Sequence, residues 1–269
     1  MTTEQKYEQL KSDIGAMESV LVAFSGGVDS TFLLRVAVDV LGADRVLALT
    51  ATSPTYPHYE FEESCKLAKA MGVRQLVVAS HELKVPDFTR NDRRRCYHCK
   101  SILFSLCRAK ATELGFSRVL DGSNLDDLDD FRPGSDAVKE QQIRSPLQDA
   151  GLTKEEIRTL SRRLGLPTAD KQAFACLSSR FPYGTELTPE RLLQVEHCEA
   201  FLRQQGFVNY RVRYHHEVAR IEVAPGELSR LLDPNLRDAV VAACKEAGFS
   251  YVALDLQGYR TGSMNEVPT

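Results

Sequence analysis

The stretch VLVAFSGGVDST (residues 20–31) passes from an apolar run through two glycines into a helix-forming segment. The run SVLVAF (19–24) predicts a buried strand, and STFLLRVAVDVLG (30–42) predicts a helix that ends at a glycine. Gly26 and Gly27 let the backbone turn sharply and approach an anion closely. The free N–H groups and the dipole of the following helix favour negative charge, so this stretch predicts a phosphate cradle.

Two common phosphate loops are excluded here, because the stretch has neither the Gly-Lys-Ser/Thr of a Walker loop nor G-x-G-x-x-G. The pattern Ser-Gly-Gly-x-Asp-Ser resembles instead the PP-loop of the ATP pyrophosphatases. That resemblance implies that ATP is cut between its α and β phosphates, giving an adenylate. It also implies that Asp29 holds Mg²⁺ or orients the loop, while the pyrophosphate contacts Ser25, Gly26, Gly27 and Ser30. The alternative is a tight glycine turn that only caps a helix.

Strand-like and helix-like runs alternate through the first half of the chain. Outward from the loop, strands are expected at 45–51, 74–80 and 117–122, and helices at 59–72 and around 99–115. Such alternation predicts an α/β fold, a parallel doubly wound sheet that forms a PP-loop ATP pyrophosphatase domain. Ligands bind such sheets at the carboxyl ends of the strands.

The ends of two further strands supply candidate nucleotide contacts. The PP-loop resemblance places the strand end at Thr50 beside the adenine, and Gly122 and Asn124 are expected to meet the nucleotide. An acidic run follows, which either feeds Mg²⁺ to the phosphates or is a solvated loop; it comprises Asp126, Asp127, Asp129 and Asp130. Arg132 is the predicted anion contact of this segment.

The character of the sequence changes near residues 183–188. We therefore expect two domains, a PP-loop domain at 1–185 and a smaller C-terminal α+β domain at 186–269. The second is expected to hold two helices, at 188–206 and 233–249, and strands within 208–223 and 251–257. It has no nucleotide-loop signature of its own.

The composition is that of a soluble globular protein, with 43% hydrophobic and 26% charged residues. The formal net charge of −3 argues against a nucleic-acid coat. No apolar run reaches the roughly 18 residues of a membrane span, and the polar N-terminus lacks the core of a signal peptide. A cytoplasmic location is expected, where cysteines stay reduced unless a metal or catalysis claims them. Four cysteines are expected to be structural: Cys65, Cys107, Cys198 and Cys244.

A Cys-x-x-Cys lies in the basic stretch RRRCYHCK (93–100). By spacing alone, Cys96 and Cys99 fit a redox pair, half of a zinc site or part of an iron–sulfur site. A thioredoxin-like redox pair belongs at a strand–helix junction of a small fold. This chain is not a small fold of that kind. A structural zinc needs four ligands, for which His98 would be a weak candidate.

Several motifs, FACLSSRFPYGT (174–185), RVRYHHEVARIE (211–222) and DFRPG (130–134), resemble the LarE family across nearly the whole chain. These ATP-dependent sulfur transferases build the nickel-pincer nucleotide cofactor of lactate racemase. The resemblance implies that ATP adenylates a carboxylate of pyridinium-3,5-biscarboxylic acid mononucleotide. A sulfur nucleophile then displaces AMP and leaves a thiocarboxylate. The resemblance also implies a symmetric homo-oligomer. From the charge and the lack of a long apolar run we expect no nucleic-acid or membrane partner.

The resemblance gives Cys176 the position of the cysteine that family members without Cys-x-x-Cys consume as sulfur donor. A thiolate is a strong nucleophile, and a basic neighbour such as Arg180 favours it. Arg211 and Arg213 lie two positions apart on a strand, so they share a face and can clamp a phosphate. The resemblance puts the substrate 5′-phosphate there, with Ser178 or Ser179 nearby, and Ser179 and Arg180 are the expected contacts. The alternative for Cys176 is a buried structural thiol. The alternative for Arg211 and Arg213 is that both are solvated arginines of a strand.

Three cysteines, Cys96, Cys99 and Cys176, suit a [4Fe-4S] cluster with one open iron. A subset of LarE-like proteins is thought to deliver sulfide from such an iron. In that case sulfide or a cysteine desulfurase system reloads the sulfur. The alternatives are a consumed Cys176 with a spectator pair, and a disulfide or persulfide relay.

Two acidic positions, Glu199 and Glu222, match a metal site of some relatives, but the third such position is the basic Arg230. Two other functions compete with sulfur transfer to the pyridinium nucleotide. A tRNA thiolase needs a large basic surface or an added RNA-binding domain, and neither is visible. A module that binds ATP without turnover would not release pyrophosphate in response to the substrate.

Overall fold

The computed structural model describes residues 1–128, 134–172 and 175–260 of the 269. The chain separates into two compact units. The first comprises Met1–Glu82 and Arg93–Phe174, and the second comprises Leu83–Asp92 and Ala175–Thr269. The units thus divide between Phe174 and Ala175, earlier than the expected domain boundary after residue 185. The domain boundary after residue 185 stays a prediction.

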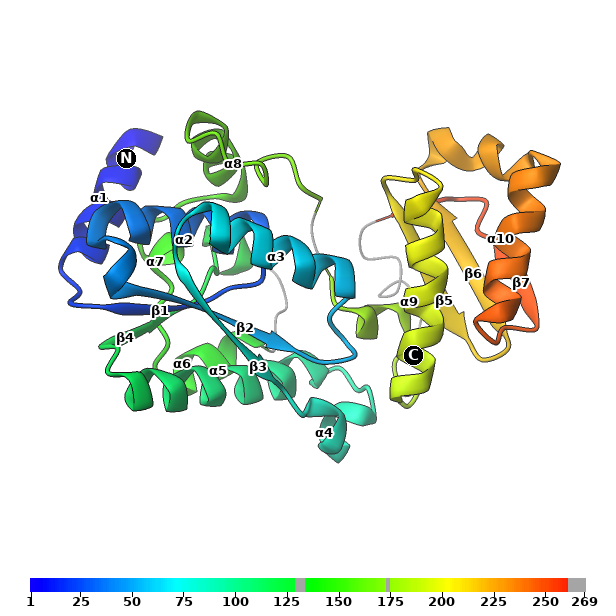
Figure 1. The fold of residues 1–269 in the computed structure, drawn as a ribbon, viewed down its shortest axis with the longest axis horizontal. Coiled ribbons are helices and arrows are strands. Elements are labelled where there is room, and N and C mark those ends of the chain that lie inside the picture. Colours follow the sequence, from blue (N-terminus) through cyan, green and yellow to red (C-terminus); the bar gives the residue numbers. More distant parts are fainter. Residues whose placement is uncertain (129–133, 173–174, 261–269) are drawn as a thin grey trace. The chain divides into compact units, whose positions relative to one another are not determined.

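The first unit is built on a four-stranded sheet of order β3-β2-β1-β4 (Figure 1). Its strands are β1 (Val20–Ala23), β2 (Val46–Thr52), β3 (Arg74–Ala79) and β4 (Arg118–Leu120). Every pairing is parallel, with Val20 opposite both Val46 and Arg118. The predicted α/β fold with a parallel sheet is therefore confirmed.

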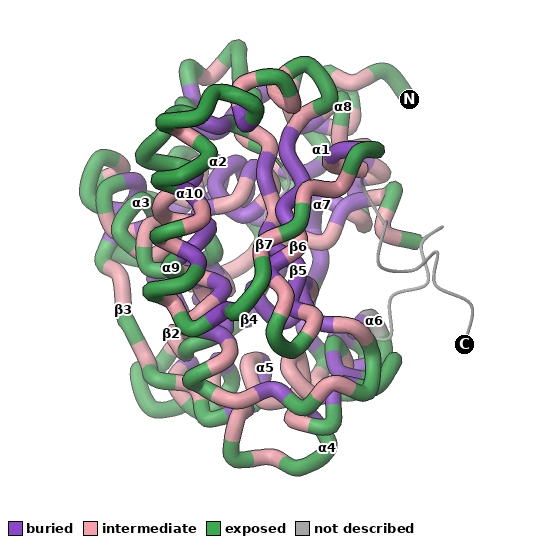
Figure 2. The backbone as a smooth tube through the Cα atoms, turned by 90° about the vertical axis from the view of Figure 1, so that its right-hand side faces the viewer, coloured by how far each residue is buried: buried purple, intermediate pink, exposed green. Residues whose placement is uncertain are grey.

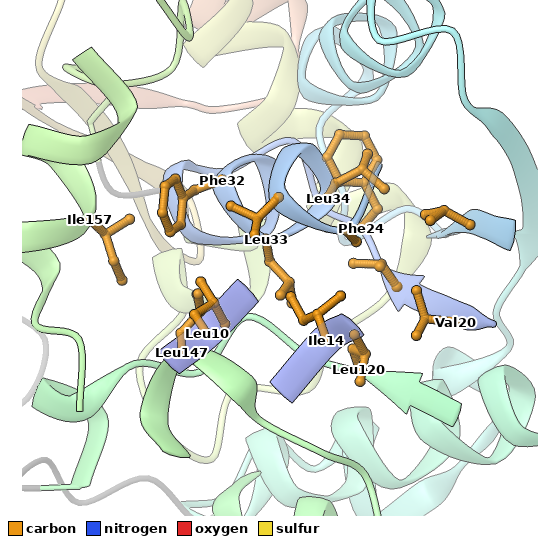
Figure 3. Packing of buried hydrophobic residues seen from close by; sticks show 14 of the residues in the cluster. Leu10, Ile14, Val20, Phe24, Phe32, Leu33, Leu34, Leu120, Leu147 and Ile157 are labelled. Carbon is orange, nitrogen blue, oxygen red and sulfur yellow. The ribbon is translucent and has the colours of Figure 1, made fainter. Parts of the chain in front are cut away.

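Helices cover both faces of this sheet (Figure 1). They are α1 (Thr3–Gly15), α2 (Val28–Leu41), α3 (His58–Ala70), α5 (Arg95–Leu114), α6 (Gly134–Glu140), α7 (Pro146–Asp149) and α8 (Lys154–Arg163), with short 3-10 turns at Ala43–Arg45, Glu82–Lys84 and Leu125–Leu128. Successive strand residues point to opposite faces. Val20 and Val22 accordingly join the core beneath α1 and α2, and Leu21 joins the core with α5. Figure 3 shows the first of these cores, where Leu10, Phe32 and Leu147 meet.

Burial separates the centre of the sheet from its edge. β1 is almost fully buried, whereas none of the residues of the edge strand β3 is buried (Figure 2). The carboxyl end of the inner strand β1, and that of the edge strand β4 beside it, whose Val119 and Leu120 are buried, are therefore well packed, which suits a site that must hold its shape.

The second unit has a three-stranded sheet of order β5-β6-β7. Its elements are α4 (Pro86–Thr89), a 3-10 turn η4 (Leu177–Arg180), α9 (Pro189–Gln204), β5 (Tyr210–His215), β6 (Val218–Val223), the 3-10 segment Pro225–Leu232, α10 (Pro234–Glu246) and β7 (Tyr251–Leu254). β5 and β6 are antiparallel, and β7 adds to β6 in parallel. This agrees with the α+β character predicted for the C-terminal part.

The segment 83–92 belongs to the second unit because it is bonded to the chain after Cys176. The amide of Asn91 donates to the Pro182 carbonyl oxygen over 2.8 Å, and the Leu187 N–H donates to the Thr89 carbonyl oxygen over 2.9 Å. Among the described helices, none is long and apolar enough to cross a membrane.

Candidate functional site

The glycine loop turns directly from β1 into α2. Gly26 has φ +66°, a left-handed conformation that favours glycine, and a Cβ added there would lie 3.1 Å from Cβ of Ser64 on α3. A Cβ on Gly122, just beyond β4, would lie 3.0 Å from the backbone N of Ser30. Both glycines are therefore required for the close packing of backbone around the start of α2.

Two serines hold the loop from within. Oγ of Ser30 accepts from the Ser25 N–H over 3.3 Å, and its hydroxyl donates to the Gly27 carbonyl oxygen over 3.3 Å. The Ser25 and Ser30 hydroxyl oxygens lie 3.1 Å apart. These contacts hold the loop in one shape, as expected of an anion cradle.

Two side chains from other segments bind the outer carbonyls of the loop. The Tyr56 hydroxyl donates to the Ser25 carbonyl oxygen over 2.8 Å, and Nζ of Lys171 donates to the Gly26 carbonyl oxygen over 3.3 Å. Burial raises the pKa of Tyr56 above its ordinary value, so the phenol stays protonated and able to donate. Neither contact was predicted from the sequence.

A pocket of about 230 Å³ opens over the loop. Its lining combines the loop with α5 and the chain after β4: Ala23, Ser25, Gly27, Asp29, Ser30, Lys100, Leu103, Phe104, Asp121, Gly122, Ser123 and Asp127. Lys100 brings a cation to a wall that also carries three carboxylates. A phosphate chain with a divalent cation matches this mixture of one ammonium group, carboxylates and a helix N-terminus.

Asp29 is the best placed carboxylate for a metal. Its Oδ2 accepts from Nζ of Lys154 over 2.5 Å, whereas its buried Oδ1 has no hydrogen-bond partner among the described residues. A buried oxygen without a partner is costly, and Mg²⁺ prefers carboxylate oxygens. The residues present therefore fit Mg²⁺ held between Asp29 and the phosphates.

The structure brings six predicted residues to the pocket: Ser25, Gly27, Asp29, Ser30, Gly122 and Asp127. Thr50 is buried, and its hydroxyl donates to the Phe24 carbonyl oxygen over 2.8 Å. Oδ1 of Asn124 accepts from the Asp126 N–H over 3.0 Å, which fixes the turn after β4. Arg132, Asp129 and Asp130 lie outside the described residues.

Sequence reasoning missed Lys100, Asp121 and Ser123 in the pocket. Lys100 directly follows Cys99, so the basic stretch contained the signal but no helix register to orient it. Asp121 ends the run VLDG and accepts from the hydroxyls of Ser123 over 2.6 Å and Ser145 over 2.5 Å. These contacts depend on the chain beyond β4 and could not be read from spacing.

The two cysteines of the Cys-x-x-Cys lie in the first two turns of α5. Cys96 is exposed and Cys99 partly buried, and residues three apart on a helix share a face. Cys176, also partly buried, belongs to the second unit and directly precedes η4. Within each unit as described, no three or more His, Cys, Asp and Glu side chains gather as a metal site.

Arg180 is the last residue of η4, the 3-10 turn that directly follows Cys176. It is buried, with 2% of its surface exposed. Its guanidinium forms a bidentate ion pair with Glu199, with both N–O distances 2.8 Å. It also donates to the carbonyl oxygens of Ala175 over 2.7 Å and Cys176 over 3.2 Å. Burial alone would raise the pKa of Glu199, but the charge and hydrogen bonds of Arg180 lower it. Arg180 thus shapes the backbone that carries Cys176.

The predicted arginine pair lies on one face of β5. Arg213 is buried and donates to Glu222 over 2.7 Å and to the Ser179 carbonyl oxygen over 3.2 Å. Arg211 is partly exposed, and its guanidinium lies 5.1 Å from the ring centroid of Tyr259. Of the pair, Arg213 is therefore the arginine that contacts the backbone of η4, at Ser179.

Glu199 and Glu222, which match a metal site of some relatives, each have a cationic partner. Glu199 pairs with Arg180, and Glu222 pairs with Arg213 and, over 3.1 Å, with Arg220. Arg230 pairs elsewhere, with Glu227 over 2.7 Å. These ion pairs neutralise the charge that would attract a metal.

A parallel α/β sheet with a Ser-Gly-Gly-x-Asp-Ser loop at the end of its first strand, and a polar pocket over that loop, defines a PP-loop nucleotide-binding domain. Residues 4–90 match the family model described as NAD synthase. A pyridinium-3,5-bisthiocarboxylic acid mononucleotide synthase of Lactiplantibacillus plantarum is 38% identical over 100% of this chain and 96% of its own length. The chain therefore belongs to the same family as that synthase, the LarE family.

Two further relatives, both described as uncharacterized proteins, are similar to this chain over most of its length. One, from Synechocystis sp., is 43% identical over 99% of both chains. The other, from Methanocaldococcus jannaschii, is 28% identical over 91% of this chain and 92% of its own. The similarity therefore extends through both compact units and beyond the phosphate loop.

Proposed function

We propose that the chain is an ATP-dependent sulfur transferase that converts a carboxylate of pyridinium-3,5-biscarboxylic acid mononucleotide to a thiocarboxylate, for the nickel-pincer cofactor of lactate racemase. The observation that carries this is the full-length similarity to a synthase of the bisthiocarboxylic product, together with the preformed phosphate loop. ATP and Mg²⁺ are the implied cofactors.

In the first step, a substrate carboxylate oxygen attacks the α phosphorus of ATP. The bond from that phosphorus to the bridging oxygen breaks, and pyrophosphate leaves with the electron pair. The loop N–H groups and Lys100 stabilise the leaving charge, while Asp29 orients the metal–phosphate group. Bound Mg²⁺ neutralises charge on the phosphates. An acyl adenylate remains, which is a far better acyl donor than a carboxylate.

In the second step, sulfur attacks the acyl carbon and the bond to AMP breaks. If Cys176 is the nucleophile, its thiolate forms a thioester. Removal of the Cα proton of that residue and cleavage of its Cβ–S bond then leave the thiocarboxylate and dehydroalanine. The Arg180–Glu199 pair holds the backbone at Cys176 for this attack, and Arg211 and Arg213 are the proposed phosphate ligands, with Ser179.

The second sulfur source is a cluster-borne sulfide. Cys96 and Cys99 share a helix face and, with Cys176 as third ligand, would hold a [4Fe-4S] cluster with an open iron that supplies sulfide. Cys176 is then retained rather than consumed. Sulfide or a cysteine desulfurase system would reload the cluster.

The test uses anaerobically purified protein, the pyridinium dicarboxylate mononucleotide, ATP and Mg²⁺. We expect AMP and pyrophosphate in equal amounts and a product in which one carboxylate oxygen is replaced by sulfur, detected by mass spectrometry. ATP cleavage that does not depend on the pyridinium nucleotide would contradict the proposal, as would thiolated tRNA as the product. Binding of ATP without any cleavage would indicate a non-catalytic module.

The sulfur source is tested with the same reaction. If Cys176 is consumed, turnover stops after one equivalent and the protein loses the mass of H₂S at that residue. If a cluster is the donor, the protein contains about four irons and acid-labile sulfide per chain, the Cys96→Ala variant loses both, and the mass of the polypeptide does not change.

A further inference from the structure

Lys171 is a largely buried lysine that contacts both α3 and the phosphate loop. Its Nζ lies 2.5 Å from Glu60 Oε2, 2.8 Å from Glu63 Oε2 and 3.3 Å from the Gly26 carbonyl oxygen. Its side chain is 16% exposed, and that of Glu60 is 5% exposed. Burial opposes the charge, but the hydrogen bonds that Lys171 donates to Glu60 and Glu63 raise its pKa, so the ammonium group persists at neutral pH.

The backbone of Lys171 is fixed as well as its side chain. Arg158 of α8 donates to the Ala169 carbonyl oxygen over 2.5 Å and to the Lys171 carbonyl oxygen over 2.9 Å. Helices α8 and α3 and the phosphate loop therefore all hold this one position of the chain.

Cys176 follows Lys171 by five positions in the sequence. A fully extended chain spans at most about 3.6 Å per residue, so covalent geometry limits the Cα separation to about 18 Å. Fixing Lys171 on the first unit thus restricts where the Cys176 thiol can go.

We propose that Lys171 is a positioning residue for sulfur transfer, which ties the segment that leads to Cys176 to α3 and the phosphate loop; this rests on the proposed function. Its two short contacts are to the carboxylates of α3, and the contact to Gly26 is the longest. Loss of the ammonium group should therefore affect delivery of sulfur more than formation of the adenylate.

The test compares Lys171→Met with a matched control, Lys6→Met. Lys6 forms a 2.8 Å ion pair with Glu156 of α8, a contact outside the phosphate loop, and their side chains are 17% and 20% exposed. Adenylation is measured as substrate-dependent exchange of pyrophosphate into ATP, and sulfur transfer as thiocarboxylate formed in a single turnover. In Lys171→Met we expect exchange within about twofold of wild type and transfer slowed about tenfold, the scale of an orientation effect. Lys6→Met should retain both rates, and Lys171→Arg should recover most of the transfer rate.

Equal loss of both rates in Lys171→Met would overturn the proposal, because it would make Lys171 a phosphate-site residue. Unchanged rates would overturn it too. Since the substitution leaves Glu60 buried without its cation, the variant could unfold. The double variant Lys171→Met/Glu60→Gln removes that charge, and the same difference between the two rates is expected of it.

A second readout does not need the substrate. We measure alkylation of Cys176 by iodoacetamide in the iron-free protein, with and without a non-hydrolysable ATP analogue. Wild type and Lys6→Met should change rate at least about threefold on binding the analogue, whereas Lys171→Met should not respond. If the wild-type protein neither exchanges pyrophosphate into ATP nor forms thiocarboxylate, the proposed function is refuted. The alkylation result would still decide the role of Lys171. Equal responses in wild type and Lys171→Met would refute that role.

Discussion

Asp29 has one carboxylate oxygen paired with Lys154 and one buried oxygen without a described partner. Asp29→Asn keeps the shape and the contact distance but removes the negative charge that would attract Mg²⁺. We expect substrate-dependent pyrophosphate release to fall at least about a hundredfold, because a bound metal contributes several kcal/mol of charge stabilisation. The measurement is the initial rate of pyrophosphate formation at saturating ATP. A near wild-type rate would exclude Asp29 as the metal-orienting residue.

Arg180 was expected to favour the Cys176 thiolate and to meet the substrate phosphate. Its guanidinium is instead occupied by Glu199, two backbone carbonyls and the Ser179 hydroxyl, so its visible role is to hold the Cys176 turn. Whether it also contacts a phosphate remains a prediction.

Removal of Arg180 should destabilise the protein strongly. Arg180→Ala leaves Glu199 buried and uncompensated, for which we expect a loss of about 3–5 kcal/mol in the free energy of unfolding. Urea denaturation followed by circular dichroism measures this loss. The paired variant Arg180→Met/Glu199→Leu should recover most of the stability, since no buried charge remains. If the double variant is as unstable as Arg180→Ala, packing rather than charge explains the effect.

At the scale of elements, Glu156 ties the beginning of α8 to α1. It completes the capping box with Thr153 and accepts from Nζ of Lys6 over 2.8 Å and from the Thr3 hydroxyl over 3.0 Å. Burial opposes ionisation, but these hydrogen bonds lower the pKa of Glu156 to about 2. The contact thus joins two helices that pack on the same face of the sheet.

This pKa makes the stability of the first unit depend on acid pH. A carboxyl whose pKa is lower in the folded state stabilises the protein above its unfolded pKa and loses that contribution as pH falls toward the folded value. We therefore expect about 1 kcal/mol, after allowance for solvent screening, to be lost between about pH 5 and pH 2. Thermal unfolding of wild type and Glu156→Gln across this range measures it. The two curves should converge at low pH, and a constant difference would contradict the assignment.

The sequence predicted the central elements better than the peripheral ones. Strand β1 and the loop follow from the apolar run and Gly26, since the signal is local and strong. Helix α5 begins at Arg95, earlier than the expected start near 99, and its N-cap residue Arg94 makes no capping hydrogen bond that would mark this start in the sequence. Neither α1 nor α8 was predicted, although each has a capping box, at Thr2 and Thr153.

The candidate site divides in the same way. Ser25, Asp29 and Ser30 lie within six consecutive residues, so the motif alone located them. Lys171 and Tyr56 reach the loop from distant segments, over a separation that only the tertiary structure closes. Long-range contacts of this kind leave no spacing pattern, and for that reason both residues were missed.

At the scale of the whole molecule, the chain leaves the first unit after Glu82, returns at Arg93 and leaves again after Phe174. The phosphate loop and the Cys-x-x-Cys belong to one unit, and Cys176 and the arginines belong to the other. In the proposed reaction the first unit activates ATP. A consumed Cys176 would belong to the second unit, whereas a cluster would draw its ligands from both units.

A cluster held by Cys96, Cys99 and Cys176 would link these two units and so stabilise the folded chain, because ligand binding to the native state alone adds to stability. We expect anaerobic protein that contains iron to melt at a higher temperature than the same protein stripped by a chelator. Cys96→Ala and Cys176→Ala should each abolish that difference. Cys65→Ala, which removes another partly buried free cysteine, should retain it. If Cys176→Ala keeps both the iron and the higher melting temperature, Cys176 is not a ligand, and its thiol is then available as the consumed sulfur donor.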